Sequence, residues 1–212
     1  MVYTDYGTVN TMTNITSSDI SNADITSIIA EATKELNGYI NTSVDRERVD
    51  YVDETRENKI DGSNVYYYIK NWRGKYLADR DDDGSVSTSD VVVYLVDSNG
   101  TETTATVSAI DGDNGKITLS SAPSSDYDVY ITYEWCYRNP STPDPLIKLA
   151  CTYLTAAYCY AKINIGRSPQ VAFGNSRFYR HIDSYRMYHD MAMNIVNEIN
   201  NKIIDYSESE VI

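Results

Sequence analysis

The chain has 212 residues, with 31 acidic and 18 basic side chains and a net charge of −13. A phosphate backbone repels a chain this acidic, which excludes a role in holding nucleic acid and disfavours binding to an anionic membrane surface. Apolar residues make up 42% of the chain and charged residues 23%. This composition excludes a wholly disordered chain. The length is sufficient for one domain with a hydrophobic core, or for a small domain that carries an insertion.

The cysteines and the apolar segments limit the cellular context. Cys151 and Cys159 lie eight residues apart in an expected helix, about 12 Å by helical rise, which is too far for a disulfide. With Cys136 as the third cysteine, a disulfide framework is excluded and a reducing compartment is favoured. The longest uncharged apolar stretch, residues 149–161, is too short to span a bilayer. The opening MVYTDYGTVNT has no basic start and no apolar run, so we expect no signal peptide and no membrane partner.

The first expected helix spans residues 21–40. Ser21 and Asp24 form an S-x-x-D capping box, and the apolar residues that follow recur at helical spacing. The next stretch, residues 45–59, alternates in charge. It fits either an extension of the helix or an exposed strand.

Between residues 62 and 138 the pattern changes to short runs of β-branched and aromatic residues. Turn signals rich in Gly, Asp, Asn, Pro and Ser separate these runs. The five expected strands are residues 65–69, 91–96, 105–110, 116–119 and 127–133. Spacers this short predict a small antiparallel sheet or barrel.

The chain then returns to helix. Asp144 is a good N-cap and Pro145 suits the first helical position, so a helix is expected over residues 145–165. This segment is apolar nearly all round, and such a helix is either buried on several sides or packed against another subunit. A second long helix is expected over residues 175–204, and residues 205–212 form an acidic tail.

Together these segments predict an α+β fold, namely a small α-helical bundle with an inserted antiparallel β module. The bundle takes residues 1–61 and 139–212, and the module takes residues 62–138. The charge is divided in a similar way, since residues 137–204 hold 8 basic and 4 acidic side chains while the rest of the chain holds 10 and 27.

Within the expected β module, residues 79–90 read D-x-D-x-D-G-x-V-x-x-x-D. This pattern resembles a calcium loop of the EF-hand type, and more closely the dockerin variant. Carboxylates at alternating positions converge on one hard cation, glycine at the sixth position permits the sharp turn, and the apolar eighth residue pins the loop to the core. The resemblance implies a structural Ca²⁺ held by the side chains of Asp79, Asp81, Asp83 and Asp90 and the carbonyl of Ser85.

The segments that flank this loop favour strands, whereas an EF-hand has a helix on each side. The alternative is an acidic, solvated turn whose aspartates make local hydrogen bonds to the backbone. The sequence leaves both interpretations open.

No catalytic constellation is visible in the sequence. His181 and His189 share one face of the expected long helix but lie about 12 Å apart. HEXXH spacing and zinc-like cysteine pairs are absent, as are the phosphate-binding and nucleophile-elbow motifs. We therefore expect no enzymatic activity.

Four phrases occur along the chain in a distinctive order: the opening Y-G-T-V-N-T-M-T-N-I, the helix S-x-x-D-I-x-x-I-I-x-x-A, the strand D-V-Y-I-T-Y and the helix P-L-I-K-L-A-C-T-Y-L-T-A-A-Y. This layout resembles the head–tail connector (adaptor, or head-completion) proteins of tailed viruses. The likeness covers most of the chain and depends on the order of the segments.

The resemblance implies a structural virion protein at the head–tail interface, made in the host cytoplasm. Copies of it would form a ring, typically dodecameric, beneath the portal protein, prolong the DNA channel and dock the next neck or tail protein. DNA would pass through the acidic lumen without being specifically bound. We also expect that one copy of the chain cannot cover the all-round apolar helix 145–165, and packing in a ring would cover it. The tail 205–212 is the candidate segment for reaching into the portal. The alternative function is a calcium-dependent binding module centred on residues 79–90.

Overall fold

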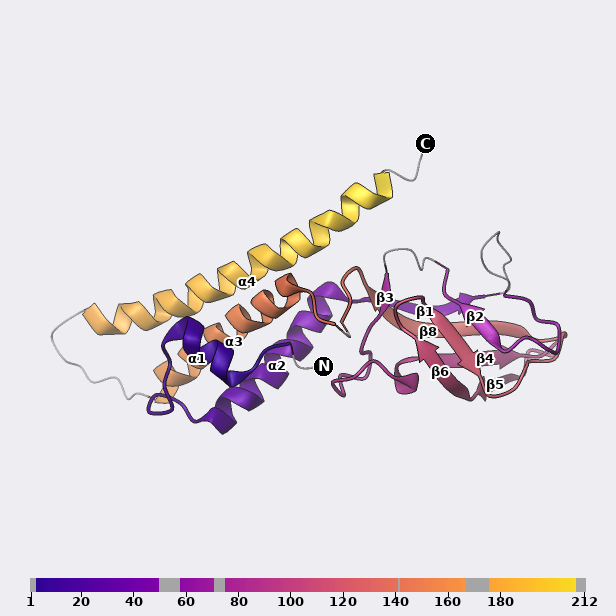
Figure 1. Cartoon of the computed structure of the whole chain (residues 1–212), viewed down its shortest axis with the longest axis horizontal. Coiled ribbons are helices and arrows are strands. Elements are labelled where there is room, and N and C mark those ends of the chain that lie inside the picture. The colour runs from indigo at the N-terminus through magenta and orange to yellow at the C-terminus, as the bar shows by residue number, and fades with distance from the viewer. Residues whose placement is uncertain (1–2, 50–57, 71–74, 141, 167–175, 209–212) are drawn as a thin grey trace. The chain divides into compact units, whose positions relative to one another are not determined.

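The computed structural model describes residues 3–49, 58–70, 75–140, 142–166 and 176–208. The chain divides into two units, a β unit of residues 41–142 and a helical unit of residues 2–40 and 143–212 (Figure 1). The first boundary lies earlier in the chain than the expected residue 61, because residues 42–48 form a strand of the β unit.

The helical unit is built from both ends of the chain. It contains α1 (Tyr6–Thr13), α2 (Asn22–Ile40), α3 (Pro145–Gly166) and α4 (Ser176–Glu208). The three helices that the sequence predicts are confirmed, and α4 continues into the expected acidic tail as far as Glu208. The first helix, α1, was not expected; Asp5 caps it by accepting a hydrogen bond from the backbone N–H of Thr8 at 2.9 Å.

The apolar circumference of α3 is covered by its own chain. This helix packs against α1, α2 and α4 (Figure 1). Its buried residues are Ile147, Ala150, Cys151, Thr152, Leu154, Thr155, Ala156, Ala157, Cys159 and Ile163. The expectation that this helix needs neighbouring copies of the chain is therefore wrong. Among the described helices, none has the length and apolar character that crossing a bilayer requires.

Three tyrosine hydroxyls in this unit donate hydrogen bonds to side chains of α2. The buried Tyr3 donates to Asn37 Oδ1 on α2 at 2.8 Å. Glu35, also on α2, accepts a hydrogen bond from Tyr158 on α3 and a second one from Tyr39 at 3.0 Å. Burial, followed by the bond to Glu35, raises the pKa of Tyr158, so this hydroxyl remains a donor at neutral pH. Each of these tyrosines thus places its polar tip on a defined acceptor, while only the Tyr3 ring is buried.

The β unit consists of two antiparallel sheets with one core. The first sheet has the order β1–β8–β4–β5, with β3 also paired to β8, and the second has the order β2–β7–β6. The strands are β1 (Thr42–Arg48), β2 (Tyr66–Tyr68), β3 (Tyr76–Leu77), β4 (Val92–Val96), β5 (Glu102–Ala105), β6 (Val107–Asp111), β7 (Lys116–Leu119) and β8 (Asp128–Cys136). Both sheets contribute to the buried cluster of Val49, Tyr67, Ile69, Leu77, Val91, Val93, Ile117, Leu119, Val129, Ile131 and Tyr133.

The expected fold class, a small α-helical bundle with an inserted antiparallel β module, is wrong. The described part of the chain contains 4 helices and 8 antiparallel strands in two sheets, so it is not a small helical bundle. The physical reason is that apolar residues alternate along strands of both sheets, so the sheets bury one face each against a shared core. The β unit is therefore a structural unit with its own core.

The charged stretch after α2 begins as a strand. In β1, the pairing with β8 shifts between Val44 and Glu47, and Arg46 in this bulge has a left-handed φ of 53°. The backbone N–H of Arg46 donates to Thr132 Oγ1 at 3.0 Å, and its guanidinium pairs with Glu102 on β5 at 2.6 Å. The charges thus lie on the solvent side of a sheet rather than along a helix. Residues 50–57 of this stretch lie outside the described residues.

The β4–β5 hairpin turns where the sequence predicts a turn, at residues 97–100. Asp97 Oδ1 accepts hydrogen bonds from the N–H groups of Thr101 at 2.7 Å and Asn99 at 2.9 Å. Gly100 takes the left-handed φ of 79° that this turn requires. The bond from Thr101 is the main cause that lowers the pKa of Asp97 below its usual 3.8.

We expect the contribution of Asp97 to stability to be fully present above pH 3.8 and to be lost as the pH falls through its lower folded-state pKa. Asp97→Asn should remove this pH dependence, since an amide does not titrate. The measurement is urea unfolding of both proteins between pH 2 and pH 6, with an NMR titration of the Asp97 carboxyl. A carboxyl that titrates at or above 3.8 would contradict the prediction.

Candidate functional site

The loop of residues 79–90 connects β3 to β4 and is anchored at both ends. Leu77 and Ala78, which precede it, donate backbone hydrogen bonds to Gly112 and Glu134 at 3.0 and 2.9 Å. Val86, at the eighth position of the motif, is half-buried and packs on the core of the β unit. The sequence predicted this anchoring role for the apolar eighth residue, and the packing confirms it.

Three of the five expected ligands gather at one point. Asp79, Asp81 and Asp83 each offer a carboxylate oxygen, and these oxygens lie within 4.8 Å of one another. Asp79 is buried and the other two are exposed. This acidic triad could hold a metal ion, because hard cations such as Ca²⁺ bind several carboxylate oxygens at once.

The backbone of the loop partly offsets the repulsion within the triad. Asp79 accepts hydrogen bonds from the N–H groups of Asp83 at 3.2 Å and Gly84 at 2.9 Å. Asp81 accepts a further bond from Asp83 N–H at 3.1 Å. Gly84 has a φ of 96°, a conformation that is strained for any residue with a Cβ. The turn predicted from glycine at the sixth position is therefore confirmed.

Asp90 lies outside the triad, and its carboxylate binds backbone N–H groups of the same loop. Its carboxylate is 1% exposed and accepts hydrogen bonds from the N–H groups of Arg80 at 2.6 Å, Ser87 at 2.7 Å and Asp81 at 3.2 Å. Burial raises the pKa of Asp90, while these hydrogen bonds oppose the shift. Asp90 also forms a capping box with Ser87 around the short 3-10 turn η1 (Thr88–Asp90).

Ser85, whose carbonyl was expected as a ligand, is exposed. Its N–H and its hydroxyl both donate to Asp83 Oδ1, at 2.9 and 2.8 Å. These bonds hold the Asp83 side chain against its own turn. The loop thus combines the two interpretations that the sequence left open. Three carboxylates converge, and local hydrogen bonds from the backbone reach Asp79, Asp81, Asp83 and Asp90.

The histidines on α4 do not form a site in the described part of the chain. His189 is half-buried, stacks on Tyr185 with ring centroids 5.7 Å apart, and lies 3.9 Å from a carboxylate oxygen of Asp190. The side chain of His181 lies outside the described residues.

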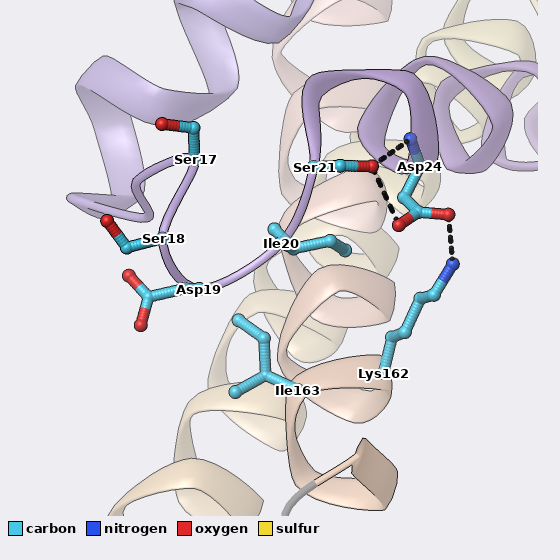
Figure 2. Close-up of a pocket in the computed structure, with 8 residues that line it drawn as sticks. All are labelled: Ser17, Ser18, Asp19, Ile20, Ser21, Asp24, Lys162 and Ile163. Carbon is cyan, nitrogen blue, oxygen red and sulfur yellow. Dashed lines mark hydrogen bonds and ion pairs between the residues drawn. The ribbon is translucent and has the colours of Figure 1, made fainter.

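A second feature, absent from the sequence reasoning, is a depression beside the N-terminus of α2. Figure 2 shows the α1–α2 loop and the end of α3 around it, with Ile20 and Ile163 facing each other. Lys162 Nζ lies 2.7 Å from Asp24 Oδ1, and Asp24 also bonds Ser21 (Figure 2). The capping box was predicted from the sequence. The ion pair with Lys162 was not, because Lys162 lies 138 residues further along the chain and no local sequence pattern indicates the pairing.

Comparison of the chain with protein-family models, with curated proteins and with solved structures found no match.

Proposed function

We propose that the chain is a structural subunit of a head–tail adaptor ring, which docks under a portal, extends the DNA channel and supports neck or tail assembly. The observation that carries this proposal is the layout of the chain. Both ends build one helical unit, and the β unit is inserted between α2 and α3. This is the order in which the connector-like phrases occur in the sequence.

Because α1, α2 and α4 of the same chain cover α3, contacts between copies must involve other residues on the surface of the helical unit. Large apolar side chains are exposed on three of its helices, with Tyr6 and Met12 on α1, Tyr39 on α2 and Met187 on α4. Tyr and Met are enriched at the centres of protein interfaces. The ring proposal therefore assigns the subunit contacts to this surface.

The charge of the β unit agrees with a channel that DNA crosses without binding. Residues 41–142 contain 19 acidic and 10 basic side chains. Repeated around a ring, this excess of negative charge would repel the phosphate backbone. A DNA-binding protein would need the opposite balance.

We expect the purified chain to form rings of defined stoichiometry, alone or on addition of the portal protein from the same virus. Mass photometry and negative-stain imaging with and without portal measure this directly. A stable monomer that ignores the portal would contradict the proposal.

A matched pair of variants on α4 locates the contact. Met187→Glu and Asn194→Glu both place a carboxylate at an exposed position of the same helix. If Met187 lies in the subunit interface, the first variant weakens each subunit contact about tenfold, the effect of losing roughly 1.4 kcal/mol, and the ring population falls. The Asn194 variant should leave the population unchanged, and circular dichroism checks that both fold.

The second candidate function is calcium binding at the acidic triad, and the convergence of Asp79, Asp81 and Asp83 favours it. Here Ca²⁺ would hold the β3–β4 loop together and offset most of the negative charge of the three carboxylates. In the alternative to the adaptor, a calcium-dependent binding module, this loop would also carry the partner contact. The carbonyl of Ser85 would complete the ligand set. Asp90 would join it only if the loop rearranges, because its carboxylate accepts hydrogen bonds from backbone N–H groups.

We expect millimolar Ca²⁺ to raise the melting temperature of the β unit by several degrees, since a ligand at ten times its Kd adds about 1.4 kcal/mol. Asp83→Asn keeps the side-chain oxygen Oδ1, which accepts hydrogen bonds from the N–H and hydroxyl of Ser85, but removes the negative charge. We expect it to weaken Ca²⁺ binding about tenfold. Asp82→Asn is the matched control, because Asp82 is exposed in the same loop but lies outside the triad. Differential scanning calorimetry and isothermal titration measure both effects. No response to Ca²⁺ would remove the metal proposal and leave the adaptor proposal intact.

A further inference from the structure

We draw no further inference here: the strongest candidate, the depression of about 360 Å³ between the α1–α2 loop and the end of α3 (Figure 2), has its lysine and the carboxylate of Asp24 already paired with each other, and nothing in the structure shows what covers it.

Discussion

Asp90→Ala is expected to lower the free energy of unfolding of the β unit by about 3 kcal/mol. The carboxylate is buried and accepts hydrogen bonds from three backbone N–H groups, those of Arg80, Asp81 and Ser87. Alanine would leave these donors without their acceptor and open a cavity beneath the loop. A buried polar group that loses its partner costs about 1–3 kcal/mol.

The expected loss is smaller than three separate charged hydrogen bonds would suggest. Such bonds contribute about 1.5–3 kcal/mol each, but burial raises the pKa of Asp90, so desolvation of the carboxylate offsets part of their sum. Between pH 3.8 and the raised pKa of Asp90, the folded state binds more protons at this carboxyl than the unfolded state does. The variant should therefore be compared with the parent at neutral pH, where the carboxylate is ionised.

Denaturant unfolding and amide hydrogen exchange measure this effect together. Exchange should accelerate at Arg80, Asp81 and Ser87 in the variant, because these amides lose their acceptor. Asp126→Asn, at an exposed position of the same unit, is the control and should change the free energy of unfolding by less than about 0.5 kcal/mol. A loss of similar size for both variants would show that Asp90 does not hold the loop together.

Local pattern was sufficient for much of the fold. Helical spacing and capping signals predicted α2, α3 and α4 to within a few residues, apart from the C-terminal extension of α4. The runs of β-branched and aromatic residues likewise marked β2, β4, β7 and β8. The run over 105–110 instead contributes to two strands of different sheets, β5 and β6. In the site, the D-x-D-x-D-G spacing indicated the convergence of Asp79, Asp81 and Asp83 as one of two interpretations.

The features that sequence reasoning missed depend on distant parts of the chain. The segment that forms α1 is rich in Thr, Asn and Gly, which are poor helix formers, and it is stabilised by packing Val9 in a cluster with Cys159 and Ile163 of α3. The charged residues of β1 are ordered by pairing with β8, more than 80 residues away. The role of Asp90 depends on whether its side chain turns into the loop or toward an ion, and a repeat of aspartates is compatible with both.

The interpretation of α3 failed for a related reason. The absence of a polar face shows that a helix has neighbours on several sides, but it does not show which chain supplies them. Here α1, α2 and α4 supply them, and α1 was the one helix of this unit that was not predicted. The subunit contacts of the proposed ring must therefore be sought on other surfaces.

Leu154→Ala is expected to lower the free energy of unfolding of the helical unit by about 3 kcal/mol, whatever the protein concentration. Leu154 is 1% exposed within a single copy of the chain, so its truncation leaves a cavity among helices of that same copy. Leu146→Ala, at a half-buried position of the same helix, should cost about 1 kcal/mol. Denaturant unfolding at several protein concentrations separates this from the rival arrangement, in which a second copy covers α3. In that arrangement the loss would shrink as the protein is diluted, because the covering copy would dissociate and leave Leu154 exposed in the parent as well.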